Sequence, residues 1–162
     1  MLLGGGTGDM VKLIQKYDAM AKMYLHRPMA HPVILLIDND DGANSIFGII
    51  KSLFSIAVSH STTSPYYYLG YNMYMVKTPE LGESKISCIE DLFPSAVTAT
   101  QLAGKHFDPD KKHEDDTKYG KHVFAENVVR PNMGAIDFSG FTPLLERVVN
   151  VIDHYATVPK PW

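Results

Sequence analysis

Two aspartates separated by one residue carry the clearest chemical signal in the sequence. Asp38 and Asp40 directly follow residues 33–37, an unbroken apolar run that predicts a central parallel strand covered on both faces. Ligands of open α/β sheets collect beyond the carboxyl ends of strands, and paired carboxylates repel one another unless a cation lies between them. Carboxylate oxygens select Mg²⁺ or Mn²⁺, with water and phosphate completing the coordination shell. We therefore expect Asp38 and Asp40 to bind Mg²⁺ or Mn²⁺.

The same residues also suit an ordinary turn. Residues 38–42 read Asp-Asn-Asp-Asp-Gly, and these residue types are frequent in turns and at the first positions of helices. Gly42 would let the backbone turn sharply in either case. From these residues alone, a metal site and a simple turn both remain open.

Apolar spacing along the chain predicts the elements that would hold these aspartates. Residues 33–37 favour a strand, and residues 46–57 after the acidic turn return to helical spacing. The polar residues 106–122 are expected to form a solvated surface segment, and residues 1–3 the end of a strand. The other expected elements are a helix over 9–24, a strand over 71–76, short helices at 89–93 and 95–102, and a last helix over 142–155. This order predicts an α/β fold with a small, mostly parallel sheet flanked by helices.

Composition sets broader limits on the protein. The chain has 162 residues, 45% of them hydrophobic, which predicts one domain over residues 1–155 with a tail at 156–162. The 15 basic and 18 acidic side chains give a net charge of −3, so charge alone is not expected to hold nucleic acid. The single cysteine, Cys88, excludes an internal disulfide and predicts a cytoplasmic location. No apolar run is long enough to cross a membrane, so no membrane partner is expected.

Several segments together resemble a known family. Residues 32–42, Pro-Val-Ile-Leu-Leu-Ile-Asp-Asn-Asp-Asp-Gly, resemble the aspartate-x-aspartate motif of the Toprim domain of topoisomerases, primases and related nucleases. Residues 4–9, 72–79, 89–93 and 119–125 resemble the Toprim region at the C-terminus of certain retron reverse transcriptases, which are RNA-directed DNA polymerases. The order and spacing of the five segments carry this resemblance, because the acidic motif alone is short.

The resemblance implies a Rossmann-like Toprim fold and Mg²⁺-dependent hydrolysis of phosphodiester bonds in DNA or RNA. Asp38 and Asp40 match the metal-binding pair, Glu90 the additional acid of the nuclease branch, and Lys121 the basic residue near the scissile phosphate. The implied partners are the reverse-transcriptase module and its RNA–DNA product. The implied setting is antiviral defence. The resemblance implies that the chain is encoded by a retron or by a shortened prophage gene.

One departure from the family pattern bears on activity. A Toprim domain starts with a strand carrying a glutamate that acts as general acid or base, and that strand would precede Gly4. We therefore expect a fragment that retains Mg²⁺ binding and has weak or absent nuclease activity alone. A non-catalytic binding domain is an alternative. A phosphoacceptor receiver domain is a further one, although the strand ending near Val76 and Lys77 offers no acid for it.

Two other features have a functional and a structural interpretation. Residues 4–8, Gly-Gly-Gly-Thr-Gly, could cradle a phosphate before a helix, but they lack the ending of a P-loop and favour a tight turn. Tyrosines at 66–68, 71 and 74 could stack on bases, but at strand positions they more often pack against a helix.

Overall fold

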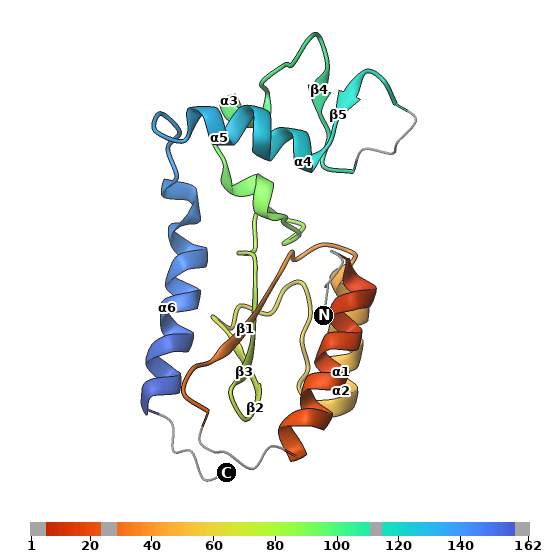
Figure 1. Cartoon of the computed structure of the whole chain (residues 1–162), viewed down its shortest axis with the longest axis vertical. Coiled ribbons are helices and arrows are strands. Elements are labelled where there is room, and N and C mark those ends of the chain that lie inside the picture. Colours follow the sequence, from red (N-terminus) through yellow and green to blue (C-terminus); the bar gives the residue numbers. More distant parts are fainter. Residues whose placement is uncertain (1–5, 24–28, 111–114, 158–162) are drawn as a thin grey trace. The chain divides into compact units, whose positions relative to one another are not determined.

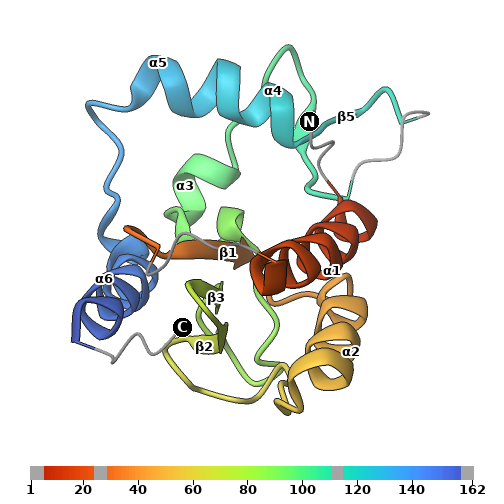
Figure 2. The same ribbon diagram turned by 60° about the horizontal axis from the view of Figure 1, so that its bottom comes forward.

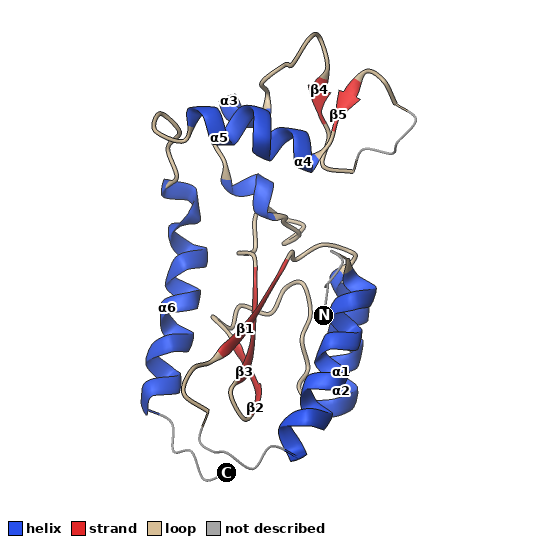
Figure 3. Ribbon diagram, viewed as in Figure 1, coloured by secondary structure: helices blue, strands red, loops and turns tan. Residues whose placement is uncertain are grey.

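A computed structural model of the chain describes residues 6–23, 29–110 and 115–157. It is a mixed α/β protein with two small sheets flanked by helices, as Figure 3 shows. The chain divides into two compact units, Met1–Cys88 with Pro143–Trp162, and Ile89–Thr142. Residues 1–3, which the sequence predicts to be the end of a strand, lie outside the described residues.

The sheet of the first unit has three strands in the order β1-β3-β2. Strand β1 (Val33–Ile37) pairs in parallel with β3 (Met73–Lys77), and their last residues, Ile37 and Lys77, are partners in the register. Strand β2 (Tyr67–Gly70) pairs with β3 in the antiparallel direction. The two predicted strands are confirmed, whereas β2 forms a hairpin with β3 that the tyrosine-rich sequence did not predict.

The prediction that residues 33–37 form the central strand is wrong for the described sheet. The central strand is β3, all five residues of which are buried, and β1 pairs only with β3 among the described residues. On β1, the side chain of Leu36 is 41% exposed. In this strand, the apolar run therefore indicated neither how fully the strand is covered nor how many strands pair with it.

Helices cover both faces of this sheet. Helices α1 (Thr7–Met23) and α2 (Ala43–Phe54) lie on one face and α6 (Thr142–Thr157) on the other, as Figures 1 and 2 show. The core between the sheet and the first two helices contains the fully buried Ile14 and Ile50. On the other face, His154 of α6 lies against Tyr74 of β3, with 2.8 Å between His154 Nδ1 and the tyrosine oxygen. All three helices confirm the predicted helical periodicity.

The second unit is smaller and builds its own aromatic core. Its elements are η1 (Ile89–Leu92), α3 (Ser95–Thr98), β4 (His106–Phe107), β5 (Lys118–Tyr119), α4 (Lys121–Phe124), a π-helical turn (Ala125–Val129), α5 (Arg130–Asn132) and η3 (Ser139–Phe141). Strands β4 and β5 pair in parallel, and Tyr119 and Phe124 are buried between them and the helices. The prediction of a wholly solvated segment at 106–122 is therefore wrong where these strands form.

Candidate metal and phosphate site

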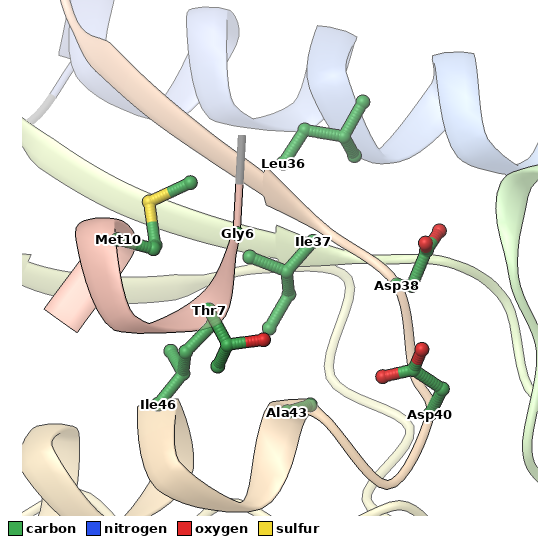
Figure 4. A pocket seen from close by; sticks show the side chains of 9 residues that line it. All are labelled: Gly6, Thr7, Met10, Leu36, Ile37, Asp38, Asp40, Ala43 and Ile46. Carbon is green, nitrogen blue, oxygen red and sulfur yellow. The ribbon is translucent and has the colours of Figure 1, made fainter. Parts of the chain in front are cut away.

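A pocket opens at the carboxyl end of β1. Its volume is about 210 Å³. The pocket is lined by residues from the first turn of α1, from β1 and the turn after it, and from the start of α2: Gly6, Thr7, Met10, Leu36, Ile37, Asp38, Asp40, Ala43 and Ile46 (Figure 4). Both aspartates singled out by the sequence therefore line one cavity, in the place where α/β sheets usually bind ligands.

The acidic turn leads directly into α2. The N–H of Ala43 donates to the carbonyl oxygen of Asp40 at 2.9 Å, which closes the turn at the first residue of the helix. Gly42 occupies the last position before α2. A Cβ atom on Gly42 would lie 3.0 Å from Asp40 Oδ1 and 3.1 Å from Thr7 Oγ1. Glycine therefore lets α1, α2 and the Asp40 carboxylate approach closely.

The two carboxylates occupy partly buried positions on either side of the buried Asn39. Figure 4 shows the Asp40 carboxylate turned back toward Thr7, while the Asp38 carboxylate extends away from that of Asp40. Within residues 6–23, 29–110 and 115–157, no hydrogen bond or ion pair engages the Asp40 carboxylate. The oxygens of Asp40 are therefore available to a ligand in the pocket.

The pocket combines groups that favour cations with groups that favour anions. Carboxylates hold hard cations, and the N-termini of helices carry a partial positive charge from their unpaired N–H groups. Helix α1 begins at Thr7 and α2 at Ala43, and both residues line the pocket. A phosphate with its metal counterion matches this combination of charges.

The donor set suits a hydrated Mg²⁺ ion better than a fully protein-bound metal. In the described part of the chain, no group of three or more His, Cys, Asp or Glu side chains could hold a metal ion. Structural zinc sites need four such ligands, whereas Mg²⁺ keeps several waters and takes one or two carboxylates together with substrate phosphates. Asp38 and Asp40 therefore fit Mg²⁺ or Mn²⁺, provided that water and phosphate supply the other ligands.

The two other predicted site residues lie in the second unit and contact each other. Glu90 belongs to η1 and is 8% exposed, and Lys121 is the first residue of α4. The distance from Lys121 Nζ to Glu90 Oε2 is 2.9 Å, which is an ion pair. Their participation in the chemistry of Asp38 and Asp40 stays a prediction.

Sequence reasoning missed a buried polar network behind the acidic turn. Lys77, the last residue of β3, has a fully buried side chain whose ammonium lies 2.9 Å from Glu80 Oε1. Arg147 donates to the other oxygen of Glu80 at 2.6 Å. The signal was present in the sequence, because Lys77 ends an otherwise apolar strand next to the strand that leads into the aspartates.

The pKa values of Lys77 and Glu80 in this network both lie below their usual values, for different reasons. Burial lowers the pKa of the Lys77 ammonium, and the hydrogen bond with Glu80 offsets only part of this effect. Burial raises the pKa of the Glu80 carboxyl, but hydrogen bonds from Arg147 and Lys77 outweigh it and bring this pKa below its usual value. Glu80 is therefore held as a carboxylate between two cations.

Comparisons with known proteins add no family to this description. No family model matches the chain, and no solved structure matches it. None of the described helices is long and apolar enough to cross a membrane. The fold and the pocket alone define the class, a mixed α/β protein with two aspartates lining a pocket beyond the end of a parallel strand.

Proposed function

We propose that this chain binds Mg²⁺ or Mn²⁺ through Asp38 and Asp40 and hydrolyses phosphodiester bonds in nucleic acid. The observation that carries the proposal is that both aspartates line one pocket with the first residues of two helices, Thr7 and Ala43. Carboxylates supply ligands for a divalent cation, and the partial positive charge at helix N-termini attracts phosphate oxygens.

The chemistry divides between the metal and the chain. A divalent cation in such a site lowers the pKa of a bound water and neutralises charge on the phosphate. Asp38 and Asp40 would hold the cation, and the N-termini of α1 and α2 would orient the phosphate by their partial positive charge. In the proposed function Glu90 is an additional acid and Lys121 stabilises negative charge near the scissile phosphate.

The size of the pocket supports a polymeric substrate. Its volume of about 210 Å³ lies below the roughly 300–1,000 Å³ of pockets that enclose a whole small molecule. One phosphate group can enter such a space while the rest of the strand lies outside it. The proposed substrate is therefore a DNA or RNA strand rather than a free nucleotide.

The resemblance of residues 32–42 to the Toprim motif supports the same chemistry. In this chain a strand (β1), an acidic turn (residues 38–42) and a helix (α2) follow one another. We include in the proposal a Rossmann-like Toprim fold derived from a retron reverse transcriptase, with its polymerase module and RNA–DNA product as partners. Antiviral defence in the cytoplasm is the proposed setting, and the single Cys88 suits that reducing compartment.

A cleavage assay tests the proposal. Purified chain is incubated with end-labelled single-stranded DNA, double-stranded DNA and RNA in Mg²⁺, in Mn²⁺ and in a chelator. We expect slow, metal-dependent cleavage of at least one substrate, which Asp40→Asn abolishes. Asp41→Asn is the matched control, since Asp41 is exposed in the same turn and does not line the pocket. Cleavage that survives the chelator or Asp40→Asn contradicts the proposal.

A further inference from the structure

Asn39, the residue between the two aspartates, is completely buried. Its backbone is fixed on both sides. The N–H of Asn39 donates to the carbonyl oxygen of Ser87 at 2.8 Å and to Thr78 Oγ1 at 2.9 Å, and its own carbonyl oxygen accepts the N–H of Ser87 at 3.1 Å. The chain after β1 is thus tied to the segment that follows β3.

The side-chain amide of Asn39 is held as firmly as its backbone. Its Nδ2 atom donates to the carbonyl oxygens of His60 at 3.0 Å and Lys85 at 2.5 Å. Its Oδ1 atom accepts from Lys77 Nζ at 3.4 Å and lies 3.2 Å from His60 Nδ1. Both amide hydrogens therefore have acceptors, and the amide oxygen has the Lys77 ammonium as a donor and a ring nitrogen of His60 beside it.

His60 extends this network across the acidic turn. One ring nitrogen, Nδ1, faces Asn39, and the other, Nε2, lies 3.2 Å from Asn44 Oδ1 in the first turn of α2. The ring packs against that of Phe47 in an edge-to-face arrangement, with 5.3 Å between the ring centroids. The imidazole thereby spans the turn that contains Asp40.

The burial of Asn39 decides where its neighbours point. In extended chain, successive side chains point to opposite sides. With the Asn39 amide fixed on the inner side by Lys77 and His60, this alternation places the side chains of Asp38 and Asp40 on the other side of the chain. Both residues line the pocket, with the Asp38 carboxylate extending away from that of Asp40 (Figure 4).

An amide is the chemical group that this position requires. An aspartate at 39 would turn both donors into acceptors, which would face the carbonyl oxygens of His60 and Lys85. An apolar side chain would remove one donor from each of these partly buried carbonyls, leaving that of His60, among the described residues, with Lys77 alone at 2.8 Å.

We propose that Asn39 is a positioning residue that orients Asp38 and Asp40 toward one metal site, and that His60 stabilises the same turn. The inference rests on the proposed function, because it names the residues that set the geometry of that site. Groups that orient metal ligands typically change metal affinity by about 10- to 100-fold when they are removed.

The test compares two buried asparagines in the same unit. Asn39→Ala removes the proposed positioning group, and Asn72→Ala is the matched control. Asn72 is 4% exposed, accepts from Tyr17 at 2.7 Å and donates to the carbonyl oxygen of His31 at 2.7 Å, at the opposite end of β3. Mn²⁺ affinity is measured by the electron paramagnetic resonance of the free ion, and stability by urea unfolding.

We expect both variants to lose stability and only Asn39→Ala to lose metal affinity, by about tenfold or more. Equal Mn²⁺ affinity in folded Asn39→Ala and in the unchanged protein would overturn the inference, and so would an equal loss in Asn72→Ala. If Asn39→Ala does not fold, His60→Ala decides, since His60 is only partly buried. The inference then requires weaker Mn²⁺ binding by His60→Ala, and unchanged binding overturns it.

Amide hydrogen exchange separates this inference from the proposed function. If the unchanged protein binds no Mn²⁺, the proposed metal site fails. The positioning role still requires faster exchange in residues 38–43 of folded Asn39→Ala or His60→Ala, with no change there in Asn72→Ala. Unchanged exchange in those residues would contradict the positioning role itself.

Discussion

Lys121 at the start of α4 forms an ion pair with Glu90 of η1, with 2.9 Å between Nζ and Oε2. The two side chains differ in exposure: 10% of the glutamate side chain is exposed to solvent, against 41% of the lysine side chain. The pair thus connects a buried carboxylate to a cation at the surface, within the unit Ile89–Thr142.

Removing the cation of this pair should destabilise the second unit. In Lys121→Met, Glu90 stays buried without this partner, and we expect a loss of about 1–2 kcal/mol, reduced from the value for fully buried pairs because solvent screens Lys121. Thermal unfolding of the two proteins measures the difference. Lys118→Met is the control, since both Lys118 and its partner Asp108 are more exposed than Glu90. An unchanged unfolding temperature in Lys121→Met would show that the pair contributes nothing.

Gly140 allows η3 to touch the backbone of η1. A Cβ atom at this position would lie 2.2 Å from the carbonyl oxygen of Leu92, a backbone atom that cannot rotate away. Gly140→Ala should therefore lower the free energy of unfolding by about 2–4 kcal/mol, as overpacking does. Urea unfolding checks this value against Gly134→Ala, where a Cβ atom would meet no heavy atom within 4 Å. Similar stability of both variants would contradict the close approach of the two backbones.

Gly42→Ala should affect the pocket more than the stability of the protein. The added methyl group would meet Asp40 Oδ1 and Thr7 Oγ1, and both are ends of side chains that can move away. We expect weaker Mn²⁺ binding because Asp40 must turn. The control is Gly48→Ala within α2, the helix that follows Gly42, which should keep metal affinity and gain about 0.5–1 kcal/mol of stability. Metal titration and urea unfolding of both variants are the measurements, and full affinity in Gly42→Ala would contradict the expectation.

Stability should fall in alkaline solution because of Tyr74. Burial, followed by the neighbouring tyrosines, raises the pKa of Tyr74 from 10.0 to about 12. Between these two values the folded protein keeps a proton that the unfolded chain releases, so the free energy of unfolding decreases as pH rises. The stabilisation is complete below pH 10 and is lost as pH approaches 12.

Urea unfolding across this pH range tests the claim, with Tyr74→Phe as the comparison. The variant loses the contact with His154 and should be less stable at neutral pH, but its stability should depend less steeply on pH. If the free energy of unfolding falls equally steeply with pH in both proteins, groups other than Tyr74 cause the loss of stability in alkaline solution.

Periodicity predicted the elements with long apolar patterns and missed those defined by a few residues. Helix α6 and strand β1 follow from their apolar spacing. The turn between β2 and β3 has positive φ angles at Gly70 (104°) and Tyr71 (52°), and a tyrosine gives no signal for that conformation. Strands β4 and β5 have two residues each, too few for any alternation to show.

The sequence predicted the charged residues of the candidate site but not the residues that orient them. Asp38 and Asp40 stand out because acids follow an apolar strand. Asn39 does not, because asparagine is usually exposed and only the tertiary contacts bury it, and for Lys77 the sequence shows only its place at the end of an apolar strand. The sequence therefore indicates which groups could bind a metal, and the structure adds what orients them.

The most direct test of the account is a Mn²⁺ titration of the unchanged protein, Asp38→Asn and Asp40→Asn, followed by electron paramagnetic resonance. Both aspartates line one pocket, so the account predicts one Mn²⁺ ion per chain, displaced by Mg²⁺. Each substitution should weaken binding by about tenfold or more. Absence of saturable binding in the unchanged protein, or full affinity in either variant, would contradict the shared metal site.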